Sequence, residues 1–501
     1  MRTKLVTTFT LAALIITALI GSFSSVSTAN GAGVVDTGQS YCYDEAGNSI
    51  PCPAPGEALF GQDANYASTT PAYRDNGDGT ISDLNTGLMW TQAYFGKMTW
   101  TDAMNSPASV SVGGYTDWRM PTIKELYSLI DFDGITGTEE ANSIPYIDTT
   151  YFAFGYGNLA AGERMIDAQY WSSTEYTSTT MGGSHTVFGV NFADGRIKGY
   201  GTARPDGNME MTQYVRYVRN EGGYTGYGVN VFVDNGNGTI TDNSTSLMWM
   251  QTDSGSSMNW AEALSYCENL DYAGQSDWRL PDAKELQGIV DYARSLDATH
   301  SAAIDPLFSV TPITDEFGQT DYAFYWTSTT HLDGRAPGDR AVYIAFGEAL
   351  GYMNNQFMDV HGAGAQRSDL KMGDPSQFAL GMGPQGDVQR IYNLARCVRG
   401  GNVTIITGGA TDPRPEQQAA GTPPQGAQGQ QNQGQQGQGL PGQGQQGQGQ
   451  AGQGQPPQAA IDACNGLSVG AACTVNTPNG TVSGACTLMQ NNVLACVPAG
   501  Q

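Results

Sequence analysis

The sequence predicts an α+β fold in which one domain-sized module of about 150 residues occurs twice. Three observations support this prediction: a repeated set of tryptophans, repeated motifs around them, and helical patterns that alternate with strand patterns. All eight tryptophans fall into two matching sets of four. In chain order, Trp90, Trp100, Trp118 and Trp171 correspond to Trp249, Trp260, Trp278 and Trp326.

The motifs around these tryptophans match between the two copies as well. The matching pairs are residues 75–92 with 234–251, 117–126 with 277–286, 170–174 with 325–329, and 215–219 with 395–399. Each copy is larger than the unit of a solenoid repeat and has the size of a domain. Residues 73–220 are called repeat one and residues 230–401 repeat two.

Each repeat shows the same order of predicted elements. The Asp-Asn-Gly turns at residues 75–79 and 234–238 predict a hairpin whose last strand ends in Leu-Met-Trp. A helix follows, with helical spacing of apolar side chains over residues 260–267 in repeat two. A second helix is expected to begin at Pro121 and Pro281, which suit first-turn positions. Short strands and long loops complete each repeat, which favours the α+β class.

The start of the chain resembles a secretory signal peptide. Residues 1–29 combine a basic start with an apolar run that is short for a bilayer span, and small residues precede a cleavage site after Ala29. An uncleaved anchor is less favoured because the run is short. The mature protein is expected to have no membrane span and to be secreted or held at the cell surface, with the periplasm left open.

Three further segments lie outside the repeats. Residues 30–72 form a lead-in rich in Gly and Pro, residues 408–460 a linker rich in Gln, Gly and Pro, and residues 461–501 a small module with four cysteines. Glycines in the linker alternate between two and three residues apart, whereas a collagen triple helix requires glycine at every third position. The linker is therefore predicted to be disordered and flexible.

The eight cysteines predict disulfides. Cys42 and Cys52 flank a turn-rich segment, and Cys267 and Cys397 are both replaced in repeat one, by Pro107 and Tyr217. We expect one bridge within each of these pairs. The pairing among the last four is left open; these are Cys464, Cys473, Cys486 and Cys496. No CxxC pair occurs, which argues against a zinc site.

The charge balance restricts the partners. With 23 basic and 48 acidic residues, the formal net charge is −25. Such a chain repels polyanions, so nucleic acid and sulfated glycans are poor partners, while neutral ligands and divalent cations are compatible with it. High solubility alone would also explain the charge.

These motifs resemble those of a known family, the C-terminal domain of the bacterial collagen-like adhesin Lcl. The resemblance rests on GLMW or SLMW, DWRMP or DWRLP with KEL, YWSST or YWTST, and the closing RYVR or RCVR, in this order and twice. It implies an extracellular binding and adhesion module, with glycan binding known in the namesake. The WR-Pro element and the closing strand also look like a C-type-lectin-like fold, and the tail is similar to a four-cysteine module of exported bacterial proteins. The lack of a collagen tract and the acidity argue against carrying over the ligand.

The candidate ligand site is a loop that is much longer in repeat two than in repeat one. Residues 358–390 replace the shorter residues 194–213, and long loops on a rigid scaffold are where binding residues concentrate. The candidate ligand-binding residues are Asp359, His361, Arg367, Asp369, Asp374, Asp387 and Arg390. An equally weighted interpretation is a surface loop whose ion pairs serve only its own packing.

Other kinds of site are less favoured. The turns at 75–79 and 234–238 lack both anchoring carboxylates of an EF-hand, so no cofactor is expected, although a weak calcium site of another type is left open. The tryptophans are interpreted as core rather than as a sugar platform. The four histidines show no metal-ligand spacing and no nucleophile motif occurs, so an enzyme is not predicted.

Together, these patterns predict a secreted, non-enzymatic binding or adhesion protein. Its ligand would be an extracellular glycan or a surface protein, and two linked copies would strengthen a weak interaction. The alternative is a structural subunit of an extracellular filament or matrix, with self-association left open.

Overall fold

The computed structural model describes most of the two repeats and part of the C-terminal module. The described residues are 33–204, 207, 209–221, 226–334, 336–414, 463–464, 468, 471–477, 480–488 and 494–498. The chain divides into two compact units, Met1–Gln436 and Gly437–Gln501, called unit one and unit two. The predicted signal peptide and nearly all of the predicted linker lie outside the described residues.

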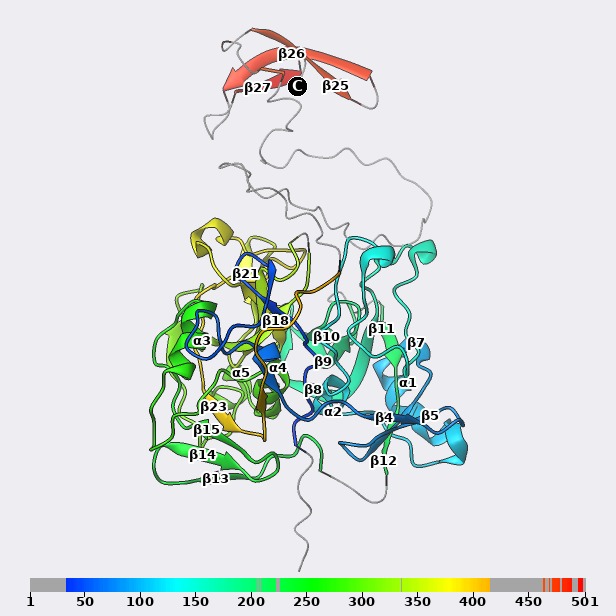
Figure 1. The fold of residues 1–501 in the computed structure, drawn as a ribbon. Coiled ribbons are helices and arrows are strands. Elements are labelled where there is room, and N and C mark those ends of the chain that lie inside the picture. Colours follow the sequence, from blue (N-terminus) through cyan, green and yellow to red (C-terminus); the bar gives the residue numbers. More distant parts are fainter. Residues whose placement is uncertain are drawn as a thin grey trace, which may run out of the picture. The chain divides into compact units, whose positions relative to one another are not determined.

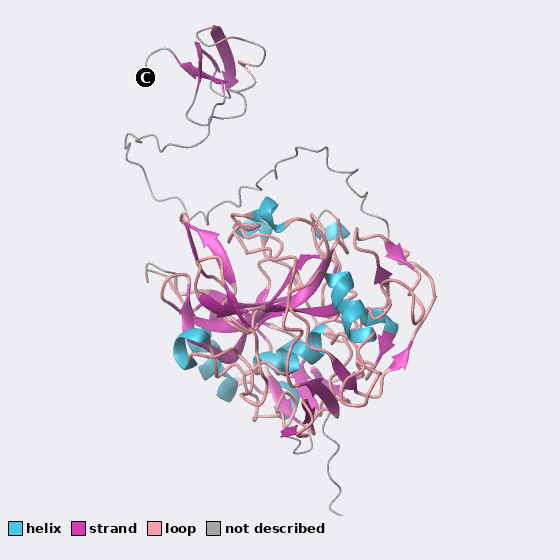
Figure 2. Ribbon diagram, turned by 90° about the vertical axis from the view of Figure 1, so that its left-hand side faces the viewer, coloured by secondary structure: helices cyan, strands magenta, loops and turns pink. Residues whose placement is uncertain are grey.

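Unit one is mainly β, which makes the prediction of an α+β class wrong. Across the described residues of both units, strands hold 34% and helices only 13%. The helices are short, and the longest α-helix of the described part has nine residues. Figure 2 shows strands running through the middle of unit one with short helices around them. The enlarged loop expected at residues 358–390 contains a strand of the main sheet, Gln366–Leu370.

One eight-stranded sheet runs through both repeats (Figure 1). Its order is β18 (Phe324–His331), β19 (Arg340–Ala345), β22 (Gln366–Leu370), β10 (Arg196–Gly201), β9 (Ser184–Asn191), β8 (Gln169–Thr180), β11 (Thr212–Val215) and β7 (Phe95–Thr99). Neighbours are antiparallel except for β11 and β8. Repeat one meets repeat two where β10 pairs with β22, at Ile197 and Gln366. This boundary is called the seam.

Each repeat also holds a four-stranded antiparallel sheet that contains the predicted hairpin. In repeat one it consists of β4 (Tyr73–Asp75), β5 (Thr80–Asp83), β6 (Leu88–Thr91) and β12 (Val218–Asn220). In repeat two it consists of β13 (Phe232–Asp234), β14 (Thr239–Asp242), β15 (Leu247–Met250) and β23 (Val398–Gly400). The Asp75 carboxylate accepts a hydrogen bond from the Gly77 amide at 2.8 Å, so this acidic side chain stabilises its own turn.

The helices begin at side-chain caps. They are α1 (Trp100–Asn105), α2 (Ile123–Tyr127), α3 (Trp260–Glu268), α4 (Ala283–Gly288) and α5 (Leu296–Thr299). Thr122 with Glu125 and Asp282 with Glu285 form capping boxes at the starts of α2 and α4. Pro121 therefore precedes the N-cap residue instead of lying in the first helical turn, and the prediction for this position is wrong.

Seven of the eight tryptophans are buried in the core, and six indole groups donate to backbone carbonyls at matching places in the two repeats. Six of the eight are at most 1% exposed, and Trp118 is 4% exposed. Trp171 donates to the Met98 carbonyl at 3.0 Å, and its counterpart Trp326 donates to the Met258 carbonyl at 2.9 Å. Burial of such large rings accounts for the repeated sequence positions.

A buried arginine in each repeat was not predicted as part of the core. Arg216 donates to the carbonyls of Thr91, Gln92 and Ala153. Its counterpart Arg396 donates to the carbonyls of Met250, Gln251 and Ser309. Each guanidinium therefore forms hydrogen bonds with backbone carbonyls of two segments. One segment is the end of a hairpin strand, and the other is a later loop of the same repeat.

The lead-in folds onto repeat two and the segment that follows it, and it also bonds with Phe132 of repeat one. Cys52 exchanges backbone hydrogen bonds with Gly408, and Gln39 bonds with the backbone of Thr330. The small pairs in this region and in the loops are β1 (Cys42–Tyr43) with β2 (Ser49–Ile50), β3 (Tyr66–Ala67) with β24 (Thr404–Ile405), β16 (Pro312–Thr314) with β17 (Thr320–Tyr322), and β20 (Leu350–Met353) with β21 (Gln356–Asp359). The 3₁₀ helices are η1 (Asp63–Asn65), η2 (Ser106–Ser109), η3 (Val112–Gly114), η4 (Glu140–Asn142), η5 (Leu159–Ala161) and η6 (Pro375–Phe378).

Disulfides brace both units. Cys42 bonds with Cys52, and Cys267 with Cys397. Unit two is an antiparallel sheet of β25 (Ala472–Thr477), β26 (Gly480–Leu488) and β27 (Leu494–Pro498). Its disulfides join Cys464 to Cys486 and Cys473 to Cys496. Within the described parts of the chain, no helix has the length and apolar character needed to cross a membrane.

Candidate functional site

The enlarged loop of repeat two lies along the seam and bonds to repeat one. The carbonyl of Asp359 accepts from the Met181 amide at 2.8 Å, and the carbonyl of His361 accepts from the Gly199 amide at 2.7 Å. Strand β22 belongs to this loop and continues the central sheet. Two of the loop's predicted site residues, Asp359 and His361, are therefore parts of an internal contact between the repeats.

Four of the predicted ligand-binding residues come together beside this seam. His361 Nε2 lies 2.9 Å from a carboxylate oxygen of Asp387, which also pairs with Arg367. Asp359 accepts hydrogen bonds from the amides of His361 and Gly362 and from the Tyr176 hydroxyl, the last at 2.9 Å. These carboxylates are thus occupied by donors of the protein itself.

Burial and pairing set the ionisation of this cluster. Burial raises the pKa of Asp359 to about 7 and lowers the pKa of His361 to about 4. Burial also acts to raise the pKa of Asp387, but the charge of Arg367 and the contact with His361 outweigh it and hold that pKa well below its usual range. At neutral pH the cluster therefore contains one firm ion pair, Arg367 with Asp387, and a neutral imidazole.

The other three predicted residues lie apart from this cluster. Asp369 is buried and accepts hydrogen bonds from the amides of Arg390 and Ile391 and from the Asn393 side chain. Arg390 forms a two-pronged ion pair with Glu316 at 3.0 and 3.1 Å. Asp374 is exposed and caps η6 through the Ser376 amide. Ligand or calcium binding by any of the seven residues stays a prediction.

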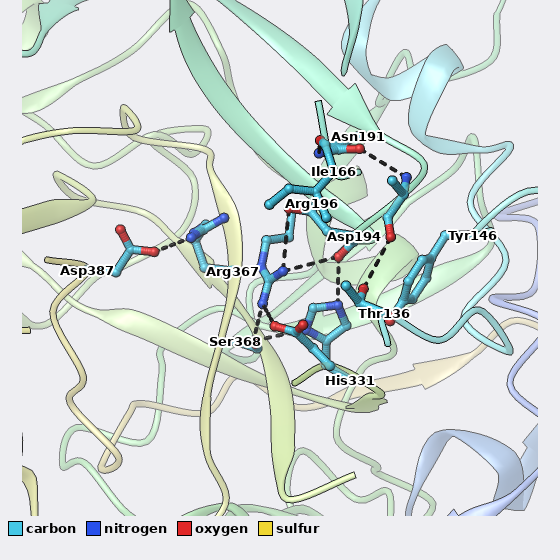
Figure 3. Close-up of polar contacts among 12 residues, drawn as sticks. Thr136, Tyr146, Ile166, Asn191, Asp194, Arg196, His331, Arg367, Ser368 and Asp387 are labelled. Atoms are coloured by element: carbon cyan, nitrogen blue, oxygen red, sulfur yellow. Dashed lines mark hydrogen bonds and ion pairs between the residues drawn. The ribbon is translucent and has the colours of Figure 1, made fainter. Parts of the chain in front are cut away.

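Arg196 of repeat one is the central cation of the seam (Figure 3). Its guanidinium pairs with Asp194 at 3.5 Å, with Asp333 of repeat two, and with the Ser368 hydroxyl at 3.3 Å. His331 lies in the same network, with its ring nitrogens 2.9 Å from Ser368 Oγ and from the Asp194 carbonyl. Burial lowers the pKa of His331 to about 3, so this ring is neutral at physiological pH.

The raised pKa of Asp359 predicts a pH-dependent stability. A carboxyl with a raised folded-state pKa favours the native state while it is protonated, and this advantage is lost as the pH rises from about 4 to about 7. Asp359→Asn changes the free energy of unfolding at each pH. We expect this change to be about 1–3 kcal/mol more stabilising at pH 8 than at pH 4. Urea denaturation of both proteins at the two pH values measures this difference; equal shifts at both would contradict it.

Repeat two also carries a groove that was not predicted from the sequence. It has a volume of about 780 Å³ and is formed by the lead-in, the end of α3, the Asp-Trp-Arg turn and the segment after β23. This lead-in groove is lined by Pro55, Gly56, Glu57, Ala58, Leu59, Phe60, Tyr66, Ser265, Glu268, Asn269, Ser276, Asp277, Trp278, Arg279, Gly400, Asn402, Val403 and Ile405.

The chemistry of the groove centres on Glu268. The Tyr66 hydroxyl donates to Glu268 at 2.8 Å, and the Arg279 guanidinium lies 5.5 Å from the centre of the Tyr66 ring. Burial raises the pKa of Glu268 to about 7 despite the opposing effects of Tyr66 and Arg279. Gly61 has a φ of +101°, and a Cβ there would lie 2.6 Å from Glu268, so only glycine allows this close approach.

The lead-in lines the groove on repeat two, whereas the corresponding turn of repeat one is more exposed. Arg279 pairs with Glu285, and its counterpart Arg119 pairs with Glu125 in the same way. The Arg279 side chain is 4% exposed, whereas the Arg119 side chain is 37% exposed. Nothing in the local sequence indicates which repeat the lead-in covers, so the groove could not be located without the tertiary structure.

The fold and the groove define a mainly β, disulfide-braced protein of two joined repeats with one composite groove. Residues 79–219 and 238–361 match the Lcl C-terminal domain, which together is more than half of the chain. The chain belongs to this family, and the prediction of tandem Lcl C-terminal modules is confirmed. The second match ends at His361, before most of the enlarged loop. No curated protein and no solved structure matches the chain.

Proposed function

We propose that the chain is an exported, non-enzymatic binding protein that holds a neutral extracellular glycan in the lead-in groove. The groove carries this proposal: its volume of about 780 Å³ is within the range of small-ligand sites. It combines the Tyr66 ring with carboxyl groups and with the side-chain amides of Asn269 and Asn402. Such groups can donate to and accept from sugar hydroxyls.

The charge of the chain supports a neutral ligand over a sulfated one. The net charge is −25, and the groove adds Glu57, Glu268 and Asp277 to the lining. The one arginine of the groove lining, Arg279, is paired with Glu285, so its charge is already balanced. A polyanion would therefore meet net repulsion at this site. A surface protein that presents an uncharged polar segment is the other ligand class compatible with the groove.

The scaffold supports a rigid binding site. The lead-in is closed by the Cys42–Cys52 disulfide, and α3 is joined to the end of repeat two by the Cys267–Cys397 disulfide. The Asp277 side chain is 61% exposed at the groove and pairs with Arg399 at 2.6 Å. A preformed site of this kind loses little conformational entropy on binding.

A matched pair of variants tests the groove. We expect Asp277→Asn to weaken the binding of a neutral glycan about tenfold, because hydrogen bonds to a charged group contribute about 1.5–3 kcal/mol. The control is Asp117→Asn, which breaks the corresponding ion pair with Arg219 in repeat one, outside the groove lining. Both changes should leave stability nearly unchanged because the Asp117 and Asp277 side chains are 60% and 61% exposed.

The measurement is a neutral-glycan array with the chain from Asn30 onward, with and without calcium, followed by calorimetric titration of the strongest ligand. A second variant, Asn269→Ala with Asn402→Ala, should weaken binding as Asp277→Asn does. Absence of binding in both conditions contradicts the proposal. Equal losses in Asp277→Asn and Asp117→Asn would place the ligand outside the groove.

A further inference from the structure

Strand β13 forms an edge of its sheet, and exposed valines lie in it and in the segment just before it. It pairs with β14 on one side, and no described strand pairs with its other side (Figure 1). Val229, Val231 and Val233 are 61%, 51% and 43% exposed, and their spacing of two places them on one face of an extended segment. Residues 229–234 are called the valine edge.

The backbone of the valine edge has groups directed away from its sheet. The Val231 carbonyl accepts from the Asn243 amide at 2.9 Å, and the Asn235 amide donates to the Thr239 carbonyl at 3.0 Å, so these residues face β14. Backbone groups alternate in direction along a strand, so those of Phe232 and Asp234 point outward. The Phe232 ring packs against Phe308 with ring centres 5.2 Å apart, which fixes the strand in place.

Repeat one protects the corresponding edge. The residues of β4 and its approach that match Val229, Val231 and Val233 are Thr70, Ala72 and Arg74. Pro71, at the position of Asn230, lacks an amide donor, and Arg74 adds a charge. Proline and charged side chains are the features by which edge strands avoid pairing with other chains. Repeat two lacks both features at the matching positions.

We propose that the valine edge pairs antiparallel with the valine edge of a second copy of this chain. With Phe232 opposite Phe232 of the second copy, Val231 lies opposite Val233, and Asn230 lies opposite Asp234. This register is self-complementary, as a two-fold interface requires. It brings valine side chains together across the pair and places Asn230, whose side chain bonds with Asp242 and Lys124, opposite Asp234, so no two like charges meet. The two four-stranded sheets would become one eight-stranded sheet.

The charge of the chain favours this edge over other surfaces for self-association. The net charge is −25, so two copies repel one another, whereas residues 229–233 contain no charged side chain. Screening by salt reduces that repulsion. Dimerisation should therefore strengthen as the salt concentration rises, in contrast to an interface held by ion pairs.

Sedimentation equilibrium of the chain from Asn30 onward tests the proposal. The test variant is Val229→Thr with Val231→Ala and Val233→Arg, which places the residues of repeat one at the edge of repeat two. We expect its dimer dissociation constant to be at least about tenfold higher than that of the unchanged chain. The control is Leu84→Thr, which removes another exposed apolar side chain, 56% exposed, and should leave the dimer unchanged.

Hydrogen exchange identifies the paired strand. The amide of Phe232 should exchange more slowly at concentrations where the dimer forms, and this protection should be absent in the triple variant. Thermal unfolding of each variant shows whether the fold is retained.

A chain that remains monomeric at high concentration and high salt overturns the proposal. So does a dimer that persists in the triple variant, or one that forms without protection of Phe232. A dimer that forms only after another protein is added would instead assign the edge to that protein.

Discussion

Replacing Arg196 by methionine is expected to lower the free energy of unfolding by about 3–5 kcal/mol, the typical cost of removing one partner from a buried ion pair. The Arg196 side chain is 11% exposed and is the cation shared by Asp194 and Asp333. Burial acts to raise the pKa of Asp333, and the charge of Arg196 outweighs it and lowers that pKa. Without the guanidinium, two carboxyl groups from different repeats would be left buried at the seam.

Urea denaturation at pH 7 measures this loss, and a surface ion pair supplies the control. Arg74 lies 3.3 Å from Glu221, and the side chains are 56% and 35% exposed. Arg74→Met should therefore change the free energy of unfolding by less than about 1 kcal/mol. Equal effects of the two substitutions would show that the seam network contributes no more than a surface contact.

Removing the Cys267–Cys397 disulfide should have the second large effect. The bridge joins cysteines 130 positions apart, and the chain-entropy relation gives about 4–5 kcal/mol for a loop of that length. The Cys42–Cys52 bridge spans 10 positions, for which the same relation gives about 3 kcal/mol. Guanidinium denaturation of the two double alanine variants under non-reducing conditions measures both losses. A larger loss from the short loop would contradict the prediction.

The repeated scaffold could be predicted from the sequence because the packing of the core sets the positions of the tryptophans. Three of the four tryptophan pairs are buried in both repeats, Trp100 is partly buried where its counterpart Trp260 is buried, and the indole hydrogen bonds of Trp171 and Trp326 match. The prediction of the α+β class was wrong because the two helical patterns in each repeat were given too much weight. Helix α2 has only five residues, whereas β8 has twelve. Strands buried on both faces lack the alternation of polar and apolar residues that identifies a strand in a sequence.

The site residues were predicted as a group but their environment was not. The enlarged loop was found because the two repeats differ there, and four of its charged residues do lie together. Their contacts with Tyr176 and Gly199 join segments more than 150 residues apart, which no local pattern indicates. The lead-in groove depends in the same way on a long-range contact, that between Cys52 and Gly408.

The seam gives the duplicated chain the character of a dimer within one polypeptide. In a dimer of separate subunits, the contact between β10 and β22 would exist only above a certain protein concentration. Here both strands belong to one chain, so the contact is present in a single molecule at any dilution. Strand β22, which comes from the enlarged loop, takes the place beside β19 that β10 takes beside β9. The extra length of repeat two thus supplies the strand that makes two copies into one sheet.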